Sequence, residues 1–181
     1  MRIILILTTL LMLGPLEVGA QWYEHEAGAP LPDTAWRKAS GDLGAMLVVS
    51  AKPEDFLREW RSSPEAYAPQ AATTDRVKRG EVIAALLFFS GCGAAGGACN
   101  AVAEFKVLKP DGSVYGEFPG NKVWPHPAPK KGLVLLSEAH LEISIEPQDP
   151  SGTYTVLAVV RELPAGRVLQ LRRNFEVIEG R

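Results

Sequence analysis

The sequence predicts an all-β protein whose sheets pack as a sandwich. The second half of the chain is a succession of short segments rich in β-branched and aromatic residues, which suit pleated strands. Glycine and proline turn signals separate these segments at short intervals, a spacing typical of β-sandwiches and barrels. No helical segments alternate with them, which argues against an α/β fold for this half.

The first 20 residues resemble a secretory signal peptide. Arg2 supplies a positive charge, residues 3–13 are apolar, and small residues precede Gln21 at the expected cleavage site. The apolar run is shorter than the roughly 20 residues of a spanning helix, so we expect no membrane span after cleavage; an uncleaved anchor is the alternative. We expect a periplasmic or secreted protein, in a compartment where disulfides persist.

Residues 21–74 are expected to form an N-terminal extension with one strand and one short helix. Residues 45–49 are apolar and predict the strand, while Ser50 and Pro53 mark a helix start. The apolar side of this helix is formed by Phe56, Leu57 and Trp60. A helix of about two turns is not stable alone, so we expect it to pack on the sheet that follows.

The remaining residues, 75–181, are expected to form the sandwich. The predicted strands cover Val77 and residues 82–89, 102–108, 114–118, 133–136, 141–145, 154–160 and 168–177. Residues 102–108 and 141–145 alternate between apolar and polar, which predicts one buried and one wet face. Residues 82–89 are apolar throughout and predict a central strand.

Two local motifs resemble immunoglobulin-like modules. Residues 149–154 read D-P-S-G-T-Y, similar to the corner in which a tyrosine hydroxyl bonds backbone a few residues upstream, so Tyr154 is its expected tyrosine. Residues 106–112 end in P-D-G, a strand and turn found in macroglobulin-type and invasin-type domains. The chain also resembles small exported bacterial proteins of unassigned function. The resemblance implies an immunoglobulin-like β-sandwich carrying a short N-terminal strand-helix appendage.

The only two cysteines, Cys92 and Cys99, flank a loop of glycine and alanine between two predicted strands. An exported chain with this spacing predicts a structural disulfide between them. A redox-active pair and a metal-thiolate site are the alternatives. The spacing lacks the two-residue separation of redox motifs, and no histidine is near in sequence to complete a metal site.

Composition and motifs argue against several classes of function. The formal net charge is −2 and the basic residues occur as pairs, such as Arg172–Arg173, so nucleic acid is not an expected partner. The three histidines are scattered, and no G-x-S-x-G motif is present. We therefore expect no metal site, no cofactor and no enzymatic activity.

The segment around Trp124 is the candidate recognition loop. Asn121, Trp124 and His126 precede or lie within a run of prolines, which makes a surface loop semi-rigid. Either Trp124 folds back on the sandwich or it is an aromatic anchor for a partner. The sequence thus favours a non-catalytic exported binding or assembly module that recognises an envelope protein or another envelope component through loops or an edge strand. The alternatives are a small periplasmic metal or redox carrier and, less favoured, a hydrolase.

Overall fold

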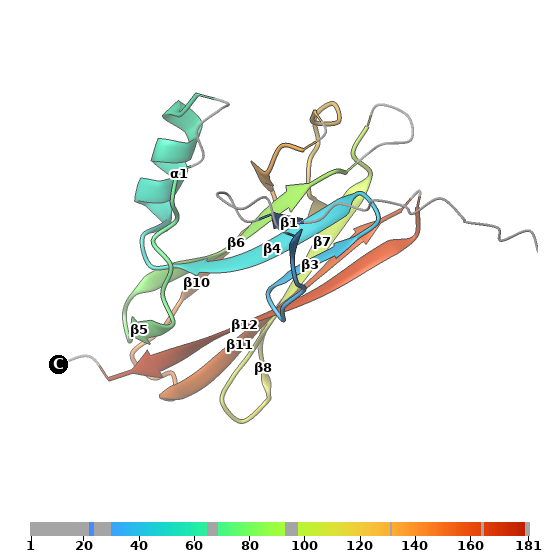
Figure 1. Ribbon diagram of the computed structural model, residues 1–181. Coiled ribbons are helices and arrows are strands. Elements are labelled where there is room, and N and C mark those ends of the chain that lie inside the picture. Colours follow the sequence, from blue (N-terminus) through green and yellow to red (C-terminus); the bar gives the residue numbers. More distant parts are fainter. Residues whose placement is uncertain are drawn as a thin grey trace, which may run out of the picture.

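The computed structural model is an all-β sandwich of two five-stranded sheets, with a two-stranded sheet and one helix outside them (Figure 1). It describes residues 22–23, 30–64, 69–92, 98–130, 132–163 and 165–179. The expected signal peptide and residues 93–97 of the cysteine loop lie outside these ranges. The fold class expected from the sequence is confirmed.

The first sheet has the strand order β10-β6-β4-β3, and β9 also pairs with β6. Its strands are β3 (Arg37–Ser40), β4 (Leu43–Ser50), β6 (Val82–Ser90), β9 (Leu135–Leu136) and β10 (Leu141–Ser144). All neighbours are antiparallel. Strand β6 is central, as its apolar sequence predicts, because both of its faces are covered: Leu87 and Phe89 lie in the main core, and Leu86 and Phe88 lie under the helix.

Helix α1 (Pro53–Ser62) covers the outer face of this sheet. Its Phe56 is 3% exposed, and the Phe56 and Trp60 rings lie 5.9 and 5.6 Å from the Phe88 ring. The helix begins at Pro53 as expected, but no side chain caps it. Ser50 instead accepts a hydrogen bond from the Lys52 amide.

The second sheet has the order β5-β12-β11-β7-β8. Its strands are β5 (Arg76–Lys78), β7 (Ala101–Leu108), β8 (Val114–Lys122), β11 (Gly152–Glu162) and β12 (Arg167–Ile178). Only β5 and β12 are parallel. In β7 every second residue is buried, so the alternation in the sequence reports a sheet with one face in the core.

The N-terminal part of the chain supplies strands to the sandwich itself. Strand β4 lies between β3 and β6, and its Leu43, Leu47 and Val49 are buried in the same core as the second sheet. The small sheet of β1 (Trp22–Tyr23) and β2 (Pro30–Leu31) lies beside β3, where Trp22 Nε1 donates to the Lys38 carbonyl over 3.2 Å. The sandwich therefore draws its strands from both sides of residue 75.

The two sheets meet along a seam between β3 and β12, where the Arg172 amide donates to the Ala35 carbonyl over 2.6 Å.

The tyrosine corner forms as expected at the start of β11. Tyr154 is fully buried, its hydroxyl donates to the Pro150 carbonyl over 3.1 Å, and its ring stacks on Phe175. This contact fixes the start of β11 against its preceding turn.

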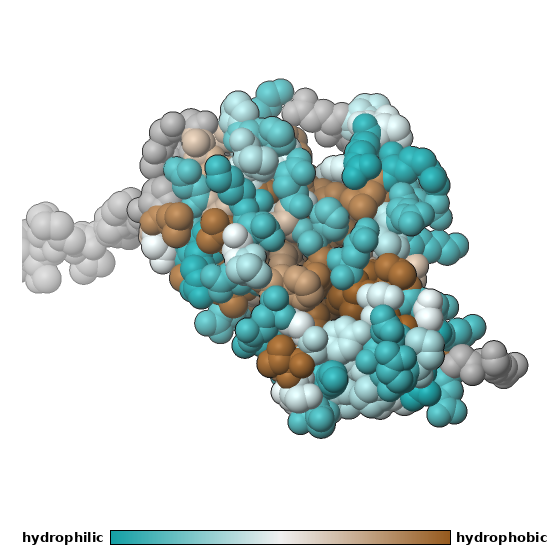
Figure 2. All heavy atoms as spheres, turned by 180° about the vertical axis from the view of Figure 1, so that it is seen from behind, coloured by the Kyte–Doolittle hydropathy of each residue, from teal (hydrophilic) through white to brown (hydrophobic). Residues whose placement is uncertain are grey.

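The back of the molecule is largely hydrophilic, with apolar side chains gathered near its middle (Figure 2). The large hydrophobic side chains that remain exposed include Val82, Val114, Phe118 and Val134, each between 39% and 48% exposed. Single exposed apolar residues are normal on protein surfaces, so these four assign no site by themselves.

Candidate functional site

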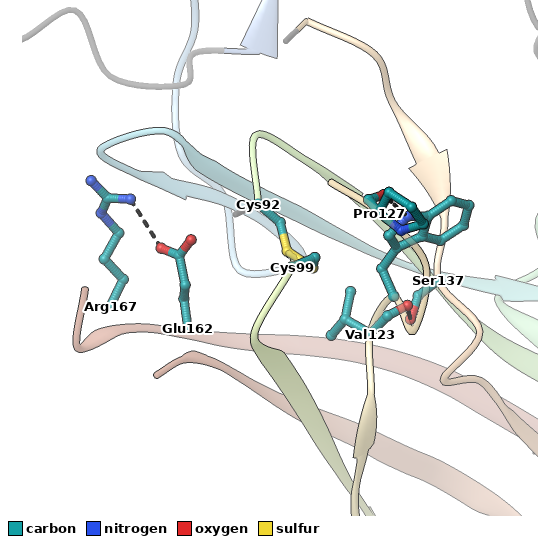
Figure 3. Close-up of a disulfide and its surroundings, with 8 residues drawn as sticks. Cys92, Cys99, Val123, Pro127, Ser137, Glu162 and Arg167 are labelled. Carbon is teal, nitrogen blue, oxygen red and sulfur yellow. Dashed lines mark hydrogen bonds and ion pairs between the residues drawn. A yellow bond between two sulfur atoms is a disulfide. The ribbon is translucent and has the colours of Figure 1, made fainter. Parts of the chain in front are cut away.

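The Cys92–Cys99 disulfide is the centre of one end of the sandwich (Figure 3). Both cysteines are buried, with Cα atoms 5.1 Å apart. The bond joins the end of β6 to the residues just before β7, and these strands belong to different sheets. The predicted disulfide is thus confirmed, and it connects the two layers of the sandwich at this end.

Gly91 directs the chain from β6 into the disulfide. Its φ angle is +70°, a left-handed conformation that residues other than glycine rarely adopt. A Cβ at this position would lie 1.5 Å from the Asp42 carbonyl oxygen. The cysteine loop therefore leaves β6 in contact with the β3–β4 turn, and only glycine permits this approach. The sequence shows this glycine but not the carbonyl that faces it.

The Trp124 loop joins the cysteine loop. Trp124 Nε1 donates to the Pro127 carbonyl over 2.8 Å, and the Trp124 ring lies 5.7 Å from that of Phe89. Pro127 in turn forms an antiparallel bridge with Ala98, next to Cys99. Trp124 is half-buried against the core. The structure therefore brings together the two segments that the sequence singled out, and Trp124 fastens its loop to the sandwich.

Ser137 fixes the segment that returns toward β10. It is buried, its hydroxyl donates to the Val123 carbonyl over 3.0 Å, and the same oxygen accepts the Ala139 amide. The Ser137 amide donates to the Leu87 carbonyl. The serine is thus used for structure, and no local sequence signal marks it, because both of its carbonyl acceptors are distant in sequence.

The exposed part of this end carries a histidine–glutamate pair. His126 Nε2 lies 3.2 Å from Glu138 Oε1, and both side chains are more than half exposed. The His126 ring also lies edge-on to Trp124, with centroids 4.8 Å apart. Asn121, the third residue expected in this loop, instead lies in β8 opposite Ala103. The pairing of β8 with β7 extends to Lys122, which places Asn121 outside the loop.

A second ion pair lies on the other side of the disulfide (Figure 3). Arg167 Nη1 is 2.9 Å from Glu162 Oε2, and the Glu162 side chain is only 4% exposed. Arg167 Nη2 lies 4.0 Å from Asp42 Oδ2, and its guanidinium packs against Gly41. A buried carboxylate needs such a partner, so this pair fixes the start of β12 beside the disulfide.

In the described part of the chain no three histidine, cysteine, aspartate or glutamate side chains lie close enough to hold a metal ion together. None of the described helices is long and apolar enough to cross a membrane.

Comparison with known proteins identifies no family. No protein-family model and no curated protein matches the sequence. Solved structures with a similar arrangement include a Niemann-Pick type C2 protein from Japanese carpenter ant, with 9% identity, TM-score 0.39 and coverage of 73% of this chain and 89% of that one. The CARDB domain of the PF1109 protein from Pyrococcus furiosus has 14% identity and TM-score 0.36, covering 58% and 81%.

A family 123 glycoside hydrolase from Clostridium perfringens has 12% identity and TM-score 0.42, and the match covers 76% of this chain. The present chain spans only 27% of that hydrolase chain. At these levels of similarity the matches concern the arrangement of strands and carry no information on activity.

Proposed function

We propose that the protein is a non-catalytic exported binding or assembly module of the bacterial envelope. Its recognition surface is the end of the sandwich formed by the Cys92–Cys99 and Trp124–Pro129 segments, which we term the loop end. The observation that carries this proposal is the bridge between Ala98 and Pro127, which fastens the two segments to each other. Its partner is an envelope protein or another envelope component.

Rigidity supports a binding role for this surface. Among the described residues of the loop end, the disulfide holds Cys92 to Cys99 and the Trp124 indole holds Pro127. The Ser137 hydroxyl holds Val123, next to Trp124. A surface that is ordered before it binds loses less conformational entropy on binding, and functional residues are often carried by loops on a rigid scaffold. Because Trp124 packs against the core, the contacts to a partner fall to the exposed His126 of the loop end and to Glu138, which is paired with it.

A binding experiment with matched variants tests this assignment. The immobilised protein is exposed to periplasmic extract, and its retained proteins are compared with those of His126→Ala and Glu138→Ala. Gln148→Ala is the control, because this exposed residue lies in the β10–β11 loop at the opposite end of the sandwich. We expect the loop-end variants to lose partners that the control keeps. An identical set of partners for all variants would reject the loop end as the recognition surface.

Export is tested separately. After expression of the full chain, the periplasmic fraction is isolated and the N-terminal residue of the protein is determined. We expect processing before Gln21. Unprocessed protein confined to the cytoplasm would reject the envelope assignment whatever the binding experiment shows.

A further inference from the structure

Four cationic side chains lie along the seam where β3 meets β12. Arg37 and Lys38 belong to β3, and Arg172 and Arg173 belong to β12. The Arg172 amide bonds the Ala35 carbonyl, so the two strands run side by side here (Figure 1). In the sequence these residues are two separate basic pairs, and the fold places the pairs on neighbouring strands. We term these four residues the cationic seam.

Trp36 holds two of these guanidinium groups. The Cζ atoms of Arg37 and Arg173 lie 5.1 and 5.3 Å from the centre of its ring. Cation–π contacts of this kind position an arginine through the face of its guanidinium. They leave the N–H edge available, and that edge carries the five donors that recognise planar or tetrahedral anions. The Arg173 side chain donates no hydrogen bond to any residue within the described ranges.

The cations of the seam are not held in ion pairs. None of its four cations forms an ion pair with a described carboxylate. The nearby Asp33 uses Oδ1 to accept the Ala39 amide, and Arg172 Nε is directed to Asn174. The formal net charge of the chain is −2, so this concentration of positive charge contrasts with the molecule as a whole.

One donor in the seam lacks an acceptor. Arg37 Nη2 donates to the Pro32 carbonyl over 3.2 Å. Its Nε is shielded from solvent and has no hydrogen-bond partner among the residues that the structure describes. A shielded donor without an acceptor is costly, and in native proteins it calls for an explanation such as a bound ion or water. An anion seated between the strands would provide the missing acceptor.

We propose that the cationic seam binds a phosphate group, either free or as the headgroup of a phospholipid. Guanidinium groups match phosphate oxygens with paired hydrogen bonds, and Arg37 and Arg173 are already positioned by Trp36. The proposed site is centred on Arg37 and Arg173, the two cations that share the Trp36 ring. Phosphate fits such a pair better than a single carboxylate does, because it carries more charge and more acceptor oxygens. This site is separate from the loop end and does not depend on the function proposed for it.

Binding is measured with two probes that share this chemistry. Inorganic phosphate is titrated into the purified protein and followed by the NMR signals of backbone amides and tryptophan indoles. Co-sedimentation is then measured with phosphatidylglycerol vesicles and with phosphatidylcholine vesicles as the neutral-headgroup reference. Binding to phosphate indicates a soluble ligand, and binding to phosphatidylglycerol vesicles without binding to free phosphate indicates a membrane surface. Either result supports a phosphate site.

The variants Arg37→Gln and Arg173→Gln test whether the seam is responsible. Each removes one charged hydrogen-bond donor, so we expect binding of the effective probe to weaken about tenfold. Arg61→Gln is the matched control, because it makes the same change of charge at an exposed position in the last turn of α1. It should bind as the wild type does.

Trp36→Leu separates positioning from charge. This variant keeps all four cations but removes the ring that holds two of them, so we also expect weaker binding, with circular dichroism as the check on folding. If Trp36→Leu does not fold, the comparison of Arg37→Gln and Arg173→Gln with Arg61→Gln decides the test. Absence of binding to both probes, or equal binding by Arg37→Gln, Arg173→Gln and Arg61→Gln, would overturn the proposal.

Discussion

At the scale of the residue, the positions of greatest consequence are set by neighbours that are distant in sequence. Gly91 illustrates this best, since its positive φ angle and the Asp42 carbonyl both exclude a side chain. Gly80 also has a positive φ angle, of +85°, but a Cβ there would meet nothing within 4 Å. A side chain at Gly80 would meet backbone strain alone, whereas a side chain at Gly91 would meet both strain and a steric clash.

The substitutions Gly91→Ala and Gly80→Ala should differ in stability. Gly80→Ala adds only the strain of a left-handed residue, about 1–2 kcal/mol. Gly91→Ala adds a clash with backbone that forces the cysteine loop away from the β3–β4 turn, so we expect a clearly larger loss. Urea unfolding of both variants measures the difference. Equal losses would show that the Asp42 carbonyl does not constrain the loop.

Tyr115 provides a pH-dependent contribution to stability. Its hydroxyl lies 2.7 Å from both the Ser144 carbonyl and Asp149 Oδ2 and shares its single proton between these two acceptors. Burial and, after it, the hydrogen bond to Asp149 and the charge of Asp149 raise the pKa of Tyr115 above its ordinary value of 10.0. A raised pKa means that the unfolded chain loses its proton first, so stability falls as the pH rises above about 10.

We therefore expect the free energy of unfolding to decrease above pH 10 in the wild type. Tyr115→Phe should be less stable near pH 7, because its hydrogen bonds are gone, and should show a smaller decrease at alkaline pH. Burial also raises the pKa of Tyr154, so some decrease will remain. Urea unfolding at a series of pH values is the measurement, and identical alkaline slopes in both proteins would contradict the role of Tyr115.

At the scale of the element, the helix covers a sheet face that the strands leave open, and the disulfide joins two strands that do not pair with each other. Helix α1 covers the outer face of the first sheet, which explains why β6 is apolar on both sides. The disulfide connects β6 to β7 across the two sheets. The two cysteines are only 7 residues apart in sequence, so the disulfide restricts only a short loop of the unfolded chain. In the folded protein it acts locally, on the loop end.

The double variant Cys92→Ser/Cys99→Ser should lose about 2.5 kcal/mol, the entropy of closing a loop of about eight residues. Wild-type protein unfolded in reducing agent should show the same loss. We also expect the NMR signals of His126 to change, because the Ala98–Pro127 bridge is next to Cys99. Unchanged stability in both reduced forms would mean that the strands hold this end without the bond.

At the scale of the whole molecule, the sandwich depends on strands from the N-terminal part of the chain. Strand β4 fills the position beside β6 and places Leu43, Leu47 and Val49 in the common core. Without it the core is open and β6 has a free edge, which exposes unpaired backbone groups.

Two fragments test this dependence. Residues 75–181 lack β3, β4 and α1, so we expect this fragment not to fold. Residues 30–181 retain all three and should give a folded protein. Circular dichroism and the dispersion of amide NMR signals distinguish the two states. A folded fragment of residues 75–181 would show that the predicted boundary separates an independent domain.

Most of the strands could be predicted from the sequence because their signals are local. The alternation in β7, the apolar run of β6 and the turns between strands are visible without the fold. The corner at Tyr154 was predictable for the same reason, since its acceptor Pro150 is four residues away. The cysteine pair was predictable from its spacing and from the expected export of the chain. The sequence indicated a loop around Trp124, which the structure has. The prediction that Asn121 belongs to this loop was wrong, because Asn121 lies in β8.

The class of fold, the tyrosine corner and the disulfide follow from the sequence, because each depends on residues close together in the chain or on a property of the whole composition. The folded structure was needed to show that β4 belongs inside the first sheet, that Pro127 meets Ala98, and that Trp36 contacts both Arg37 and Arg173. These contacts join residues that are far apart in sequence, and no local pattern specifies which strand edge pairs with which. The cationic seam therefore exists only in the folded protein.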